Sequence, residues 1–124
     1  MKEIVYVFLG GGLGSVFRFL LHLFINGRGP VSGFPWSTFV INVLGCLLIG
    51  VFHTLSARFH LSAETRLFLT MGLCGGFTTF STFSNENLFL LREGMYFALA
   101  SYLVLSILLG ILAVWAGAFL AGKI

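Results

Sequence analysis

Four long apolar stretches, separated by short polar segments, form the hydrophobic pattern of this sequence. They cover residues 4–25, 34–57, 64–92 and 95–120. A helix needs about 20 predominantly apolar residues to cross the hydrocarbon core of a bilayer, and each stretch is long enough to do so. The pattern therefore predicts an all-α membrane protein in which residues 1–124 form a single domain of four transmembrane helices.

The third stretch contains a segment that is poorly suited to a continuous helix. Its sequence over residues 71–87 is MGLCGGFTTFSTFSNEN. Glycine lowers helix stability, and serine and threonine hydroxyls can bond to backbone groups that a break sets free. We expect the helix to break between residues 75 and 79 and then to resume. Non-helical backbone at membrane depth is tolerated only where protein buries it or where it lines a watery path, so this segment is a candidate site.

Helical geometry divides the resumed half into two stripes of different chemistry. One stripe is mainly aromatic and the other is polar: they consist of Phe80, Phe83 and Asn87, and of Thr79, Thr82 and Glu86. An aromatic stripe on a membrane helix usually faces lipid or packs internally. Its alternation with hydroxyls and a carboxylate favours a narrow polar path here.

The first stretch combines small residues with one buried charge. Gly10 and Gly14 form a GxxxG pair, which predicts close packing against a neighbouring helix. Arg18 lies about two turns from the end of the same stretch, where a charge costs roughly 3 kcal/mol on insertion scales. Its side chain either extends to the headgroups or has an interior role in an anion vestibule, and the sequence leaves both possibilities open.

The second and fourth stretches each carry two polar residues one helical turn apart. Thr38 and Asn42 share a face of the second, and Tyr102 and Ser106 share a face of the fourth. The Asn42 amide needs a partner, either as an interhelical hydrogen bond or as a donor that lines a pore. Ser106 either bonds back to its own helix or forms a polar track with Tyr102.

Composition agrees with a membrane location and excludes other classes of protein. The chain is 58% hydrophobic and 9% charged, whereas soluble domains are about 25% charged. The seven basic residues are scattered, so the net charge of +3 indicates no nucleic-acid partner. Cys46 and Cys74 lie within apolar segments, as packing residues do. An enzyme is not expected, because the chain has no aspartate, no Ser/His/Asp set and no Walker-type loop.

The distribution of basic residues gives only a weak signal for membrane orientation. With four spans, one side holds four basic residues and the other holds two, or three if Arg18 extends outward. The four are Lys2, Arg58, Arg66 and Lys123, and the two are Arg28 and Arg92. Such a chain can insert in both orientations and assemble as an antiparallel pair. Four short helices do not readily enclose a pore alone, so we expect an oligomer, and inverted repeats with broken helices recur in transport proteins.

The run GLCGGFTTFSTFSNE over residues 72–86, together with Asn42 and with Arg18 in a glycine-rich first span, resembles the Fluc/CrcB family of fluoride channels. The resemblance covers essentially the whole chain. It implies a fluoride-selective passive channel, multi-pass in the bacterial inner (plasma) membrane, that lowers cytoplasmic fluoride. It also implies an antiparallel, dual-topology homodimer with two pores.

The same resemblance assigns roles to individual residues. Phe80 and Phe83 match the paired pore phenylalanines, whose ring edges carry partial positive charge. The other matching pore positions are Asn42, Thr38, Tyr102, Ser106, Ser81, Thr82 and Glu86, and Arg18 matches a vestibule residue. The polar track would continue at Gly110 and Val114, which carry no hydroxyl.

The helix break resembles the family's structural sodium site. The backbone carbonyls of Gly75 and Thr78 match its ligands, contributed by both subunits on the two-fold axis of the dimer. Hard cations prefer oxygen ligands, and a break in a helix exposes carbonyl oxygens. Sodium would then be a structural cofactor and not a transported ion.

A small four-helix, dual-topology multidrug exporter coupled to protons is the main alternative. Such an exporter needs a deep carboxylate, ideally in the first span. Glu3 lies at the very end of that span and Glu86 follows the hydroxyl-rich break, so the fluoride channel is favoured. A purely structural membrane protein would not need a broken, hydroxyl-lined helix.

Overall fold

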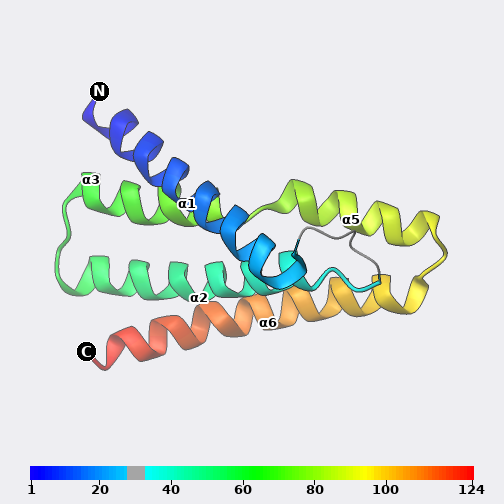
Figure 1. Ribbon diagram of the computed structural model, residues 1–124. Coiled ribbons are helices and arrows are strands. Elements are labelled where there is room, and N and C mark those ends of the chain that lie inside the picture. The colour runs from blue at the N-terminus through cyan, green and yellow to red at the C-terminus, as the bar shows by residue number, and fades with distance from the viewer. Residues whose placement is uncertain (28–32) are drawn as a thin grey trace.

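All regular elements in the described residues are helices. The computed structural model describes residues 1–27 and 33–124 (Figure 1). Three long helices, α1 (Lys2–Asn26), α2 (Trp36–Arg58) and α6 (Tyr96–Gly122), are each long and apolar enough to span a membrane, with mean hydropathies of 1.8, 2.0 and 2.5. Each overlaps one predicted stretch, so the all-α class and the membrane-spanning character are confirmed. Arg28, which the sequence places in the first loop, lies outside the described residues.

The remaining predicted stretch is divided into four short pieces. They are α3 (Ala63–Arg66), the π-helix η1 (Leu67–Cys74), α4 (Gly75–Phe77) and α5 (Phe80–Arg92). Ser62 caps α3, because its Oγ accepts a hydrogen bond of 3.2 Å from the Thr65 N–H. At the other end of this unit, Gly94 has a positive φ of 71° in the turn that connects α5 to α6.

The break lies at Thr78 and Thr79, later than expected. Thr78 has φ −89° and ψ 160°, and Thr79 has φ −153° and ψ 119°. Gly75 and Gly76 are helical instead, which corrects the predicted start of the break. Gly76 lies so close to the backbone of Gly11 that a Cβ would overlap it. Glycine is therefore needed at this position for helix packing, and threonine hydroxyls cap the break.

Small residues bring the helices into contact along two seams. A Cβ on Gly10 or Gly14 would overlap the backbone of η1, which confirms the close packing predicted from the GxxxG pair. On the other seam, Gly50 of α2 faces the backbone at Val114, and Gly117 of α6 faces the backbone at Leu47. Backbone contact of this kind adds van der Waals attraction, which drives helix association where lipid surrounds the protein.

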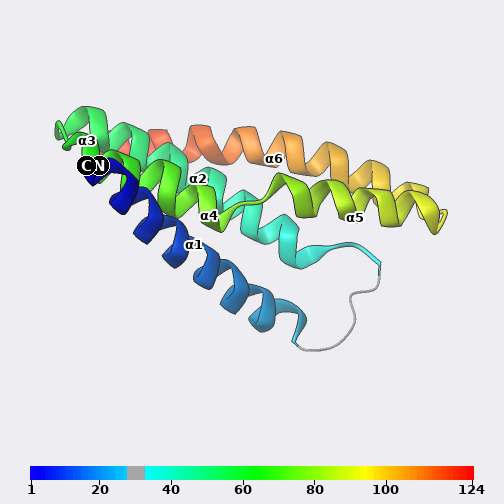
Figure 2. The same ribbon diagram turned by 90° about the horizontal axis from the view of Figure 1, so that it is seen from above.

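The two seams produce a bundle with one divergent helix. α2 and α6 run side by side, whereas α1 slants away from the other helices toward its C-terminal end (Figure 2). Both termini lie at the same end of the helices (Figure 1), as an even number of spans requires. At that end Arg58 donates a hydrogen bond from Nη1 to the carbonyl oxygen of Gly122 and so connects α2 to the end of α6.

Candidate functional site

The site begins with the backbone groups that the break sets free. The Asn42 side chain satisfies two of these groups. Its Oδ1 accepts from the Thr79 N–H at 2.9 Å, and its Nδ2 donates to the Thr79 carbonyl at 3.2 Å. Thr79 in turn caps α5, because its Oγ1 accepts from the Thr82 N–H at 3.2 Å. Asn42 therefore makes the interhelical hydrogen bonds that its position in a membrane helix requires. A carboxamide has two N–H donors, so one remains for a ligand.

At the break the backbone carbonyls of residues 75–78 lose their helical donors, among them those of Gly75 and Thr78. In a continuous helix the Thr79 amide would donate to Gly75 O and the Thr82 amide to Thr78 O. Here the Thr79 amide donates to Asn42 and the Thr82 amide to the Thr79 hydroxyl. Gly75 and Thr78 both line the same open groove. Backbone carbonyl oxygens are ligands of the kind that hard cations prefer.

We call this groove, of about 410 Å³, the phenylalanine groove. Besides the break it is lined by Asn42, Phe80, Phe83 and Ser106. The rings of Phe80 and Phe83 lie with their centroids 5.8 Å apart at 38°, and Phe80 is 78% exposed. The Ser106 Oγ is buried and has no hydrogen-bond partner within the described residues, so Ser106 does not bond back to its own helix. The groove thus brings together two phenylalanine rings and the neutral polar side chains of Asn42 and Ser106.

Glu86 joins three helices next to this groove. Its Oε2 accepts from the Thr38 hydroxyl of α2 at 2.9 Å, and its Oε1 accepts from the Tyr102 hydroxyl of α6 at 2.8 Å. Tyr102 is fully buried, and its ring lies 4.8 Å from the ring of Phe83. Both predicted polar pairs, on α2 and on α6, therefore face the helix that carries the phenylalanines.

A second cavity, of about 310 Å³, lies on the other side of Thr79. We call it the vestibule; Arg18, His22, Thr38, Thr79 and Thr82 line it. The half-buried Arg18 donates from Nε to the carbonyl oxygen of Gly76 at 3.1 Å. The Arg18 side chain is thus directed to the break, and its interior role in an anion vestibule stays a prediction.

Two sequence expectations concern positions that lie outside these cavities. Ser81 is exposed and lines neither, although its Oγ lies 3.2 Å from the Thr79 Oγ1. Gly110 is buried, and a Cβ there would contact Cys46 of α2. Val114 lies where Gly50 approaches the backbone of α6. In this chain the positions that would extend the polar track beyond Ser106 serve helix packing.

Sequence reasoning missed two residues next to the site. His22 of α1 lines the vestibule, and its Nδ1 lies 2.9 Å from the Oγ of Ser37, which is 1% exposed. The available signal was the spacing of His22, one turn after Arg18, which places both on one helix face. Ser37 gave no such signal, because its burial depends on how α1 approaches α2.

Comparisons with known proteins agree along the whole chain. A family model described as CrcB-like protein, Camphor Resistance (CrcB), matches residues 5–118. A protein of Phocaeicola vulgatus named fluoride-specific ion channel FluC is 54% identical over 121 residues, which cover 98% of this chain and 99% of the relative. Proteins of the same name are 55% identical in Bacteroides fragilis, over 97% of this chain and 96% of the relative, and 47% identical in Flavobacterium psychrophilum, over the full length of both.

Proposed function

The chain belongs to the CrcB family, and on this premise we propose that it is a fluoride-selective passive channel in the plasma membrane, where it is a multi-pass protein. The observation that supports this most directly is the phenylalanine groove, in which Phe80, Phe83 and Asn42 gather beside the break. The channel lets fluoride that ionises inside the cell leave it again. The protein is accordingly a transport protein and not an enzyme.

Fluoride is small and strongly hydrated, so a selective path must offer groups that take the place of its hydration shell at short range. Ring edges of phenylalanine carry partial positive charge, and the free N–H of Asn42 and the Ser106 hydroxyl are neutral donors. Groups of this kind replace hydration without the strong fixed charge that would favour larger, easily dehydrated anions such as chloride. We assign Thr38, Tyr102, Thr82, Glu86 and Ser81 to the continuation of this path, with Arg18 at its vestibule.

An antiparallel homodimer would complete the path. Phe80 is 78% exposed in the single chain, and the groove that it lines is open on one side. An ion in such a groove would face lipid unless a second copy covered it. The difference in basic residues between the two ends, four against two, is a weak orientation signal and is compatible with insertion in both orientations.

A structural sodium ion at the centre of this dimer fits the residues at the break. The carbonyls of Gly75 and Thr78 lose their helical donors and line one groove. Bound there, Na⁺ would be held by backbone oxygens of both copies and would neutralise their partial charges.

The proton-coupled multidrug exporter receives less support. Its carrier would have to be a carboxylate that exchanges protons with a drug-binding path. Glu86, the candidate, accepts hydrogen bonds from both Thr38 and Tyr102 and is already satisfied.

Efflux from liposomes tests the proposed function. Purified protein is reconstituted with internal potassium fluoride or chloride, and valinomycin starts voltage-driven efflux that ion-selective electrodes record. We expect rapid fluoride loss without chloride loss. Equal loss of both anions would contradict selectivity, and fluoride retention by folded protein would contradict the function itself.

A further inference from the structure

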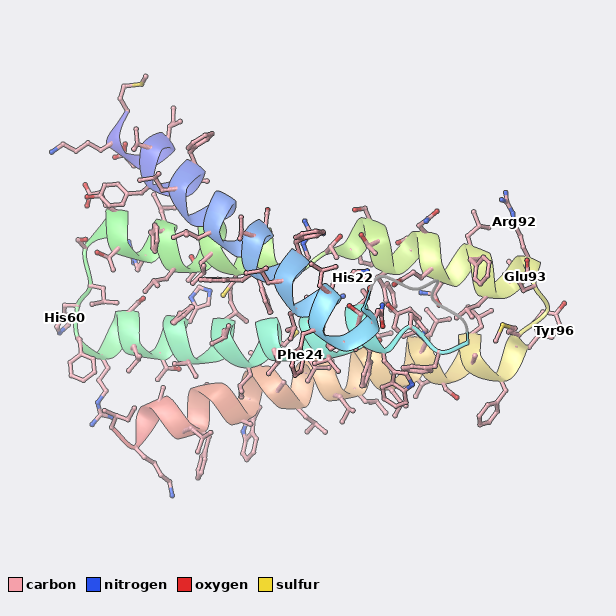
Figure 3. All side chains as sticks on the ribbon, in the orientation of Figure 1. His22, Phe24, His60, Arg92, Glu93 and Tyr96 are labelled. Atoms are coloured by element: carbon pink, nitrogen blue, oxygen red, sulfur yellow. The ribbon has the colours of Figure 1, made fainter. Side chains whose placement is uncertain are left out.

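His22 has no role in the function proposed above, yet it lines the vestibule. Figure 3 labels it on the C-terminal part of α1 together with Phe24. Their exposures separate the two side chains: Phe24 is 86% exposed, whereas His22 is half-buried and lies against the cavity. The contact of its Nδ1 with the buried Ser37 hydroxyl fixes the ring on this side of the helix. The other ring nitrogen remains for a ligand in the cavity.

The vestibule offers anion-binding groups on two of its walls. On α1, Arg18 uses Nε for the carbonyl of Gly76. A guanidinium has five N–H donors, so those of its two Nη groups remain. Thr82 also lines the cavity, and its hydroxyl accepts from the Thr79 hydroxyl at 3.2 Å, so its own O–H remains for an anion. The volume of about 310 Å³ is several times the roughly 30 Å³ that one water occupies in the liquid, so a partly hydrated small anion fits.

We propose that His22 is a second, proton-controlled cationic ligand, beside Arg18, for the small anion in the vestibule. Histidine is the side chain that ordinarily changes its charge between about pH 5 and 8. When protonated, the ring of His22 donates from both nitrogens, one to Ser37 and one to the anion. This inference rests on the proposed function, since fluoride would bind in the vestibule before it enters the phenylalanine groove.

Three other charged or titratable groups lie close to His22 in the described residues. Arg18 lies on the same wall and carries a charge at all relevant pH values. From α5, Glu86 accepts a hydrogen bond from Thr38, which lines the same cavity as His22. From α6, Tyr102 is bonded to Glu86. A pH effect on flux can therefore arise from Glu86 as well, and the test has to separate the two.

The test compares fluoride efflux at about pH 6 and about pH 8, the range in which histidine changes charge. Both sides of the liposome membrane have the same pH, and the leak of neutral acid through protein-free liposomes is subtracted. The parent is compared with His22→Gln, which never carries the charge, and with His22→Arg, which always does. His53→Gln is the matched control, because His53 is exposed on α2 and lies outside the vestibule.

We expect the parent and His53→Gln to conduct at least about threefold faster at the lower pH, a modest part of the tenfold or more that focused charge adds to association rates. The Gln and Arg variants should lose this dependence on pH, and the Arg variant should conduct fluoride faster than the parent at the higher pH.

Persistence of the pH dependence in both His22 variants would overturn the inference and leave the channel function standing, as would a parent without pH dependence. No fluoride flux from folded parent at either pH would overturn the proposed function and this inference together. If His22→Gln fails to fold, the Arg variant alone decides.

Discussion

At the scale of single residues, one carboxamide connects the broken helix to the rest of the protein. Asn42 satisfies the N–H and the C=O of Thr79 with a single side chain. Buried backbone groups without partners cost about 1–3 kcal/mol each. The same side chain lines the phenylalanine groove. Folding of the break and recognition of the anion therefore depend on the same amide.

Replacing Asn42 with alanine should weaken both the folding of the break and the recognition of the anion. We expect Asn42→Ala to lower the free energy of unfolding in detergent by about 2–6 kcal/mol, because the N–H and the C=O of Thr79 both lose their partner at about 1–3 kcal/mol each. Asn85→Ala is the matched control, since Asn85 is exposed on α5. Equal unfolding free energies for the two variants would contradict the role of Asn42.

The Glu86 cluster makes a second prediction at this scale. Thr38→Val and Tyr102→Phe each remove one donor to the same carboxylate. Groups that share a partner do not contribute independently, and the coupling free energy is typically about 0.5–3 kcal/mol. A double-mutant cycle on unfolding free energies should show coupling in this range. Additive effects would mean that the two hydroxyls do not act on one carboxylate.

From the sequence, most of these residues could be identified as candidates for the site. They are the ones whose polar chemistry is unusual inside a membrane span. Arg18, Asn42 and Glu86 stand out because polar groups inside a span need partners. His22 and Ser37 do not stand out, since their contact exists only after α1 packs on α2. The sequence also could not decide between an interhelical hydrogen bond and a pore-lining donor for Asn42, because an asparagine suits both roles.

At the scale of elements, the glycines of the first and third spans have a packing role. Gly10 and Gly14 of α1 and Gly76 of α4 allow backbones to touch. The sequence predicted the four helical segments and one interruption well, because apolar length and threonine chemistry are local properties. It placed the interruption too early, because local propensity treats Gly75 and Gly76 as breakers, whereas the approach of α1 makes glycine necessary in a helix.

Two alanine substitutions in α1 test the packing role. A Cβ on Gly14 would overlap the backbone of Leu73 and Phe77, whereas a Cβ on Gly12 would meet nothing within 4 Å. We expect Gly14→Ala to destabilise the protein by about 1–3 kcal/mol, as overpacking does. Gly12→Ala should be neutral or stabilising by up to about 1 kcal/mol, because alanine is the better helix former. Thermal unfolding in detergent measures both, and equal effects would refute the seam between α1 and η1.

At the scale of the whole molecule, the single chain leaves its candidate path open. Phe80 is largely exposed, and the groove beside it runs along the broken helix. The basic residues give the chain little preference for one orientation. Together these features support a channel that two oppositely oriented copies complete.

Labelling from the two sides of the membrane tests that assembly. Cys46 and Cys74 are replaced by alanine, and Lys123→Cys places one thiol at the exposed C-terminal end. With antiparallel copies, an impermeant maleimide should label about half of the chains in sealed cells, and the rest only after permeabilisation. Labelling confined to one side would contradict dual topology.

The central claim is that fluoride passes along Phe80 and Phe83, and substitution of these rings tests it most directly. Fluoride efflux from liposomes is measured for Phe80→Leu and Phe83→Leu, with Phe24→Leu as the control on the exposed side of α1. We predict that each groove variant loses at least about tenfold in rate, equivalent to about 1.4 kcal/mol of barrier, while Phe24→Leu conducts like the parent. Parent-like fluoride flux in both folded groove variants would contradict the account.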